Sequence, residues 1–229
     1  MYYTSGCIQY LVGIYMLPNC FFARDPQIVA RELLGKVLCV KYQGVWLKAI
    51  IAATEAYYLA DKASHASLGY TSKRQALFMM PGTIYMYYSR GGDSLNVSCQ
   101  GAGNAVLIKS ALPFLQGRKV KKMVQLMQRL NPQKNSLQPR PLAKLCSGQA
   151  LLCRALNLKV VQWDKKKFDR KKFYIVACGY KPTEIKQTTR LGIPQGRDEH
   201  LPYRFVALDF VCDCEKICYY QVMERWPSG

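Results

Sequence analysis

The chain has 229 residues and half of them are hydrophobic, which suits one folded domain, or one with a large insertion, and excludes a mainly disordered protein. Lys and Arg number 33 against 14 Asp and Glu, a formal net charge of +19. Residues 109–172 carry 17 basic and two acidic side chains, and residues 94–163 contain no Asp or Glu. Such concentrated charge favours nucleic-acid phosphates as the partner, over an anionic membrane or a merely soluble basic surface.

The N-terminal segment is apolar from Cys7 to Leu17, but Gln9 and Gly13 interrupt it and it is too short to cross a bilayer. The first basic residue is Arg24, so the positively charged start of a signal peptide is missing. We therefore expect an intracellular protein without a membrane segment.

Ten cysteines are scattered along the chain, and no C-x-x-C occurs. Cys212, Cys214 and Cys218 do cluster beside two acidic residues, but the chain has only two histidines and lacks thiolate pairs at ligand spacing. We expect reduced thiols in a core, no metal site and no cofactor.

The first predicted elements are a helix and a hairpin. Asp25 and Pro26 begin an apolar run that ends at Gly35, the pattern of a capped helix. Two β-like runs follow, Lys36–Tyr42 and Val45–Ala53, joined by a Gln-Gly turn. This arrangement puts Glu55 just past the end of a strand, where its side chain can leave the sheet for a cleft.

Later segments predict further strands and two helices. Strand candidates are Thr83–Tyr88, Ser94–Cys99, Ala105–Leu112, Phe173–Cys178 and Tyr203–Val211. A basic amphipathic helix covers Val120–Leu130, a second helix starts with Ser147 as N-cap, and Asn131–Leu142 between them is a loop. With no internal repeat, this order predicts an α+β fold: one domain over residues 1–229, built on a curved, mostly antiparallel sheet with inserted helices.

The candidate chemistry gathers around Glu55. Tyr57 shares its face if the strand continues, His65 follows in a polar loop, and alternation puts Tyr85 and Tyr87 on one strand face. Each has a plain explanation: strand tyrosines are often half-buried, a loop histidine is often on the surface, and Glu55 could pair with one of many cations. Together they indicate a pocket for a planar heterocycle beside a general base.

These residues resemble the alkyladenine (3-methylpurine) DNA glycosylase family. The resemblance covers roughly Leu17 to Val206, so that residues 1–16 and 209–229 are atypical ends. Its segments are Ala30–Leu38, Thr54–Tyr57, His65, Phe78–Tyr87, Asn96–Ser98, Val106–Ala111, Leu145–Gly148, Arg190–Ile193 and Pro202–Phe205.

The resemblance implies a monofunctional DNA glycosylase of base excision repair. Such an enzyme flips an alkylated or deaminated purine out of duplex DNA and hydrolyses its N-glycosidic bond, leaving an abasic site. By resemblance, Glu55 activates the water, Tyr57, His65 and Tyr87 sandwich the base, and Asn96 screens against normal guanine. The expected partner is double-stranded DNA containing damaged purines. We expect the protein to be intracellular, to act as a monomer and to need no cofactor.

The chain departs from the family at a hairpin that protrudes to insert a side chain into the DNA. The family usually places a bulky residue, typically Tyr, in the minor groove from this turn. The segment Tyr88–Asp93 is one residue shorter and contains two glycines, leaving Arg90 as the expected tip, with Ser89 or Tyr88 as alternatives. Lys109 stands where the family often has a phosphate contact, although a solvated lysine is the plain alternative. The run Lys165–Lys172 is expected to be a flexible basic loop.

One rival interpretation is a non-catalytic basic module that binds structured RNA or DNA through the same cations and aromatic rings. A membrane-surface protein is a more remote alternative.

Overall fold

The computed structural model describes residues 15–89 and 91–210. Over these residues nine strands form one sheet, in which every pair is antiparallel and the order is β1-β7-β2-β3-β6-β5-β4. β9 lies beside the second part of β3, and β8 pairs with β9. The strands are β1 Tyr15–Met16, β2 Val37–Tyr42, β3 Val45–Tyr57, β4 Ile84–Ser89, β5 Gly92–Ser98, β6 Ala105–Pro113, β7 Phe173–Ala177, β8 Ile185–Thr188 and β9 Arg204–Ala207.

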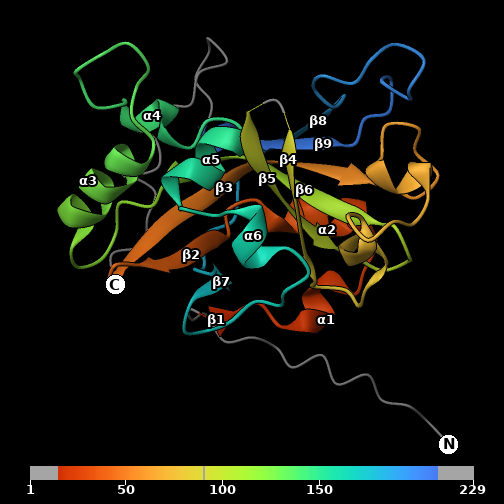
Figure 1. Ribbon diagram of the computed structural model, residues 1–229, viewed down its shortest axis with the longest axis horizontal. Coiled ribbons are helices and arrows are strands. Elements are labelled where there is room, and N and C mark those ends of the chain that lie inside the picture. Colours follow the sequence, from red (N-terminus) through yellow and green to blue (C-terminus); the bar gives the residue numbers. More distant parts are fainter. Residues whose placement is uncertain (1–14, 90, 211–229) are drawn as a thin grey trace, which may run out of the picture.

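Helices interrupt the order of strands, and the β4–β5 hairpin rises at the top of Figure 1 beside α5. The helices are α1 Asn19–Phe22, α2 Pro26–Leu33, α3 Val120–Leu130, α4 Leu142–Leu145, α5 Gln149–Ala155 and α6 Val160–Trp163, with 3₁₀ turns η1 His65–Leu68, η2 Gln75–Phe78 and η3 Leu208–Phe210. The predicted α+β fold around a mostly antiparallel sheet is confirmed.

Strand β3 is the longest element and positions the site. Its first part pairs with β2, its last part pairs with β9, and β6 follows it on the other side. The prediction that the strand ends at Ala53, with Glu55 just past it, is wrong: pairing with β6 and β9 extends the strand to Tyr57. The Thr54 hydroxyl donates to Ala30 of α2 at 2.7 Å, so by alternation Glu55 and Tyr57 face away from that helix.

The predicted cap of α2 and the following turn are confirmed. The Asp25 carboxylate accepts the backbone N–H groups of Gln27 and Ile28, at 2.8 and 3.4 Å. Gln43 and Gly44 have φ of 46° and 73°, as a type I′ hairpin turn requires. The sequence pattern was sufficient here because each feature depends on neighbours within a few residues.

Two helix predictions have different outcomes. The amphipathic helix over Val120–Leu130 is confirmed as α3, and residues 131–141 form neither helix nor strand, as expected. Leu142, predicted to be the last residue of that loop, instead begins α4. The N-cap of α5 is Gly148 rather than Ser147, so that assignment is wrong. Gly148 has φ of +98°, a conformation that serine rarely adopts.

The basic run Lys165–Lys172, expected to be flexible, contacts the outer edge of β4. The N–H of Lys165 donates to the carbonyl of Ile84 at 2.9 Å, and the N–H of Ile84 donates to the carbonyl of Lys166 at 2.8 Å. The Lys167 ammonium donates to the carbonyls of Met80 and Pro81. The run therefore covers a sheet edge that would otherwise expose unpaired backbone groups.

The cysteine prediction is confirmed for the described core, where Cys39, Cys99, Cys146 and Cys153 are buried free thiols. The cluster from Cys212 to Cys218 lies outside the described residues. Within residues 15–89 and 91–210 no group of three His, Cys, Asp or Glu could hold a metal ion. In the same ranges no helix is long and apolar enough to cross a membrane.

Candidate active site

A cavity of about 350 Å³ opens where β3, the β4–β5 hairpin and two connecting segments meet. The connecting segments are the one that follows β3 and the one between β8 and β9. A volume of this order suits a small planar ligand. The side chains used below line it: Tyr57, His65, Tyr85, Tyr87, Ser89, Asn96, Lys109, Gln149, Leu191 and Arg197.

Aromatic rings form one wall of the cavity. The ring centroids of His65 and Tyr87 lie 4.3 Å apart in a T-shaped contact, and those of Tyr85 and Tyr87 lie 5.6 Å apart. The predicted common face of Tyr85 and Tyr87 is therefore confirmed, because both rings contact His65 and line the same cavity. Rings in this arrangement offer stacking surface to a planar base.

His65 is held by a tyrosine and faces two cations. Its Nδ1 lies 2.9 Å from the Tyr85 hydroxyl. Burial, then the charges of Arg74 and Arg197, lowers the pKa of His65 below its ordinary value of 6.5. Burial raises the pKa of Tyr85, so its hydroxyl keeps its proton and can donate to Nδ1 of a neutral imidazole. In that tautomer Nε2 carries the hydrogen.

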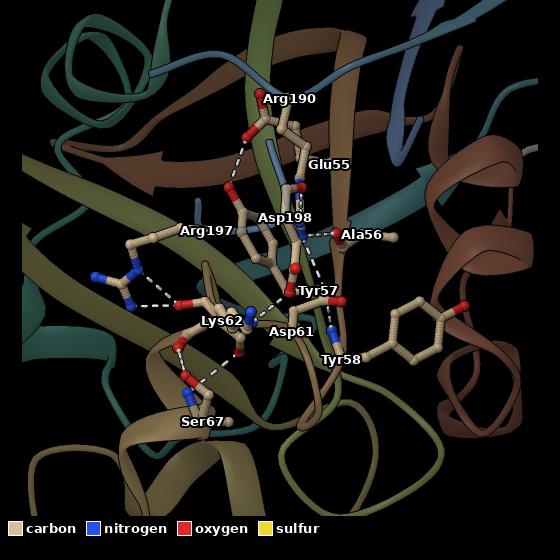
Figure 2. Close-up of polar contacts among 12 residues, drawn as sticks. Glu55, Ala56, Tyr57, Tyr58, Asp61, Lys62, Ser67, Arg190, Arg197 and Asp198 are labelled. Carbon is tan, nitrogen blue, oxygen red and sulfur yellow. Dashed lines mark hydrogen bonds and ion pairs between the residues drawn. The ribbon is translucent and has the colours of Figure 1, made fainter. Parts of the chain in front are cut away.

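Glu55 is completely buried immediately behind the cavity wall. Its Oε2 accepts the Tyr57 hydroxyl at 2.8 Å, and its Oε1 accepts the Leu191 N–H at 3.2 Å (Figure 2 shows the tyrosine contact). The Lys109 ammonium lies 3.2 Å from Oε1 and 3.4 Å from Oε2. All three partners are donors, which complement a carboxylate, and all three belong to residues that line the cavity.

Tyr57 connects the carboxylate to the wall. Burial, reinforced by the neighbouring Glu55 charge, raises the pKa of Tyr57 far above its ordinary value. The phenol therefore stays protonated and donates to Glu55, while its ring lines the cavity.

Two amide side chains line the cavity, one from β5 and one from α5. Asn96 is buried on β5, opposite Tyr85, and its Nδ2 donates to the carbonyl of Tyr85 at 3.2 Å. Gln149, the first residue of α5, donates to the Ser94 hydroxyl at 2.9 Å. Both amides thus have fixed orientations.

The β4–β5 hairpin stands at the mouth of the cavity. Ser89 lines it, whereas Tyr88, on the opposite face of β4, is 68% exposed. Arg90, the expected tip, lies outside the described residues. α5 braces the hairpin, because the Arg154 guanidinium donates to the carbonyl of Gly91 at 2.7 Å.

The structure brings the predicted base-binding residues together around one cavity, with Glu55 behind it. Lys109, expected at a phosphate, instead forms an ion pair with Glu55. Sequence reasoning assigned no role to Arg190, Leu191, Arg197 or Gln149. The first three lie in a polar segment whose contacts with Glu55, Asp61 and Lys62 span more than 120 residues, so no local pattern marks them.

Comparisons with known proteins agree on one family. Residues 20–209 match the family described as Methylpurine-DNA glycosylase. Proteins named "Putative 3-methyladenine DNA glycosylase" from Pseudomonas aeruginosa (strain LESB58) and Pseudomonas savastanoi pv. phaseolicola are each 54% identical over 200 residues. These alignments cover 87% of this chain and 83% and 89% of the relatives. A protein of the same name from Koribacter versatilis is 35% identical over 203 residues, covering 86% of this chain and 92% of that protein.

Proposed function

The chain belongs to the methylpurine-DNA glycosylase family, and from that premise we propose that it removes alkylated purines from double-stranded DNA. The proposed reaction is hydrolysis of the N-glycosidic bond, which releases the base and leaves an abasic sugar. The observation that carries the proposal is a buried carboxylate placed directly behind a cavity lined by aromatic rings.

Base recognition follows from the shape and chemistry of the cavity. We propose that a flipped purine lies against Tyr57 on one side and the rings of His65 and Tyr87 on the other. A purine alkylated at N3 or N7 is positively charged and gains about 0.5 to 2 kcal/mol from each favourable aromatic contact. A weakly paired lesion also costs less to unstack than a normal base, which adds selectivity before any bond breaks. Asn96, fixed by its bond to Tyr85, would exclude the extra amino group of guanine.

Glu55 is proposed to be the general base. As the bond between C1′ and the base nitrogen breaks, the bonding electron pair leaves with the base and the sugar gains positive charge. Water attacks C1′ and Glu55 accepts the water proton. A cationic base leaves without protonation, so one carboxylate is sufficient.

Access of water to Glu55 requires one of its partners to move. Tyr57, Lys109 and Leu191 occupy the positions around both carboxylate oxygens. The lysine side chain is 18% exposed, whereas the Tyr57 ring is packed against Arg190 and the Leu191 donor belongs to the backbone. We propose that a DNA phosphate draws the Lys109 ammonium away from Glu55, so that a water molecule can bind the carboxylate. In this proposal Lys109 forms the observed ion pair in the free protein and the expected phosphate contact in the DNA complex.

The hairpin is proposed to fill the gap left by the flipped nucleotide. Arg90 remains the proposed tip, with Ser89 beside the cavity and Tyr88 exposed on the other face. The positive charge of the chain would hold the flanking DNA backbone.

The test is excision from a duplex that contains a single 7-methylguanine. Wild-type protein should produce alkali-labile breaks at the lesion, whereas Glu55→Gln should bind the duplex and produce none. Equal binding by both proteins with no abasic site from either would instead support the non-catalytic nucleic-acid-binding module.

A further inference from the structure

Arg190 lies behind the cavity wall, in the segment between β8 and β9. The same segment forms a hydrogen bond to Glu55 of β3. Its side chain is fully buried, and its Cζ lies 4.6 Å from the ring centroid of Tyr57 and 5.3 Å from that of Tyr203. The guanidinium therefore contacts both tyrosine rings. The next residue, Leu191, donates its backbone N–H to Glu55 at 3.2 Å.

The guanidinium also cross-links three parts of the chain (Figure 2). Nη1 donates to the carbonyl of Ala56 at 3.1 Å and to the Asp61 carboxylate at 2.8 Å, and Nη2 donates to the carbonyl of Asp198 at 3.3 Å. Asp61 in turn accepts the N–H of Tyr58 at 2.9 Å. The end of β3, the segment after it and the segment before β9 are thus tied at one point.

We propose that Arg190 is a positioning residue that keeps the stacking face of Tyr57 and the Glu55 carboxylate in register for base excision. This inference rests on the proposed function. Arg190 touches neither reacting atom: it acts through the Tyr57 ring, whose hydroxyl donates to Glu55, and through the Leu191 N–H.

The physical reason lies in the shape and burial of the guanidinium. A planar guanidinium can lie over aromatic rings while its N–H groups bind oxygens at its edge, which a lysine ammonium cannot do. Replacing a buried ion pair with neutral side chains of similar volume often leaves stability unchanged. An ion pair alone would therefore not require arginine at this position, whereas the combined contacts with two rings and three oxygen atoms favour it. Small displacements of reacting groups can reduce a rate by about a hundredfold.

The test uses the double variant Arg190→Met/Asp61→Asn, because removing one partner would leave the other charge buried and unpaired. Single-turnover excision at saturating protein should fall at least about tenfold at a temperature where unfolding measurements show both proteins to be fully folded, so that lost stability does not account for the slower rate. Arg190→Lys, which keeps the charge, should remain slow. A wild-type rate in either variant would overturn the proposal.

The matched control is Arg24→Met/Glu32→Gln. Arg24 also lies 4.6 Å from a ring centroid, that of Phe21, and 2.8 Å from a carboxylate, that of Glu32. This pair is on α2 and the turn before it, neither residue lines the cavity, and excision should be unchanged. A loss of excision in the control equal to that in the Arg190 variant would also overturn the proposal.

A binding measurement separates this proposal from the proposed function. In the Glu55→Gln background, affinity is compared for duplexes containing hypoxanthine and a tetrahydrofuran abasic analogue. The Arg190→Met/Asp61→Asn change should reduce the ratio of affinities, hypoxanthine duplex over abasic duplex, about tenfold, which corresponds to the loss of one base–aromatic stack. Affinity for the abasic duplex itself should change little. An unchanged preference contradicts the role of Arg190, whereas absence of excision by the wild type contradicts the proposed function alone.

Discussion

His65 is the residue of the cavity wall whose charge is most sensitive to pH near neutrality. In the folded protein, burial and the charges of Arg74 and Arg197 lower the pKa of His65, whereas in the unfolded chain it titrates near 6.5. Between the two pKa values the unfolded chain binds more protons, so this contribution to stability is full above about pH 6.5 and decreases as pH falls.

We therefore predict that His65→Gln makes stability less dependent on pH. Between pH 7 and 5.5 the free energy of unfolding of the wild type should decrease more than that of the variant, because only the wild type carries a histidine whose pKa is lower in the folded state. Urea unfolding at both pH values measures the difference, and glutamine retains an acceptor for the Tyr85 hydroxyl. Other groups, such as Asp164, whose pKa burial raises, titrate in both proteins and cancel. An equal decrease in both proteins would contradict the assigned environment of His65.

At the scale of single residues, the sequence predicted which residues lie at the candidate site better than it predicted their contacts. Glu55, Tyr57 and Tyr87 could be recognised because they lie in strands with regular alternation or in recognisable family segments. The pairing of Lys109 with Glu55, and of Arg190 with Asp61, depends on residues 54 and 129 positions apart. Only the folded sheet brings these charges together.

At the scale of elements, the hairpin and α5 are fitted to each other through two small residues. A Cβ built on Gly92 would lie 2.3 Å from the Cβ of Ala150, far inside the contact distance. Glycine at the first position of β5 therefore allows α5 to approach the hairpin and to place Gln149 and Arg154.

We predict that Gly92→Ala destabilises the protein by about 1–3 kcal/mol through overpacking and slows excision from duplex DNA. Ala150→Gly alone should cost about 1 kcal/mol as a helix substitution, but should recover stability when combined with Gly92→Ala. Chemical unfolding of the wild type, the two single variants and the double variant gives the coupling free energy between the two positions, which we expect to be at least about 1 kcal/mol. Strict additivity would mean that the hairpin does not pack on α5 as described.

Elements were predictable where local signals were strong. α2 and α3 have a cap or regular apolar spacing, and both were found. β1 and β8, with two and four residues, have no pattern of their own and exist through pairing with β7 and β9. The extension of β3 beyond Ala53 has the same origin, since its last residues are ordered by partners distant in sequence.

At the scale of the whole molecule, charge and cavity are expected to make separate contributions to DNA binding. The net charge of +19 acts on phosphates that every duplex carries, while the cavity acts on one flipped base. Neutralised phosphates release counterions, so the first contribution weakens steeply with salt. Stacking of a neutral base between rings involves no release of counterions and should be nearly independent of salt.

We accordingly predict that Glu55→Gln, which should bind without cutting, loses about a thousandfold in affinity for any duplex between 50 and 200 mM salt. Its preference for a hypoxanthine duplex over an undamaged one should change less than about threefold over the same range, because both duplexes share the phosphate contacts. Fluorescence anisotropy titrations with the two duplexes at several salt concentrations measure both quantities. A preference that disappears in parallel with overall affinity would show that the damaged base is recognised through the backbone rather than within the cavity.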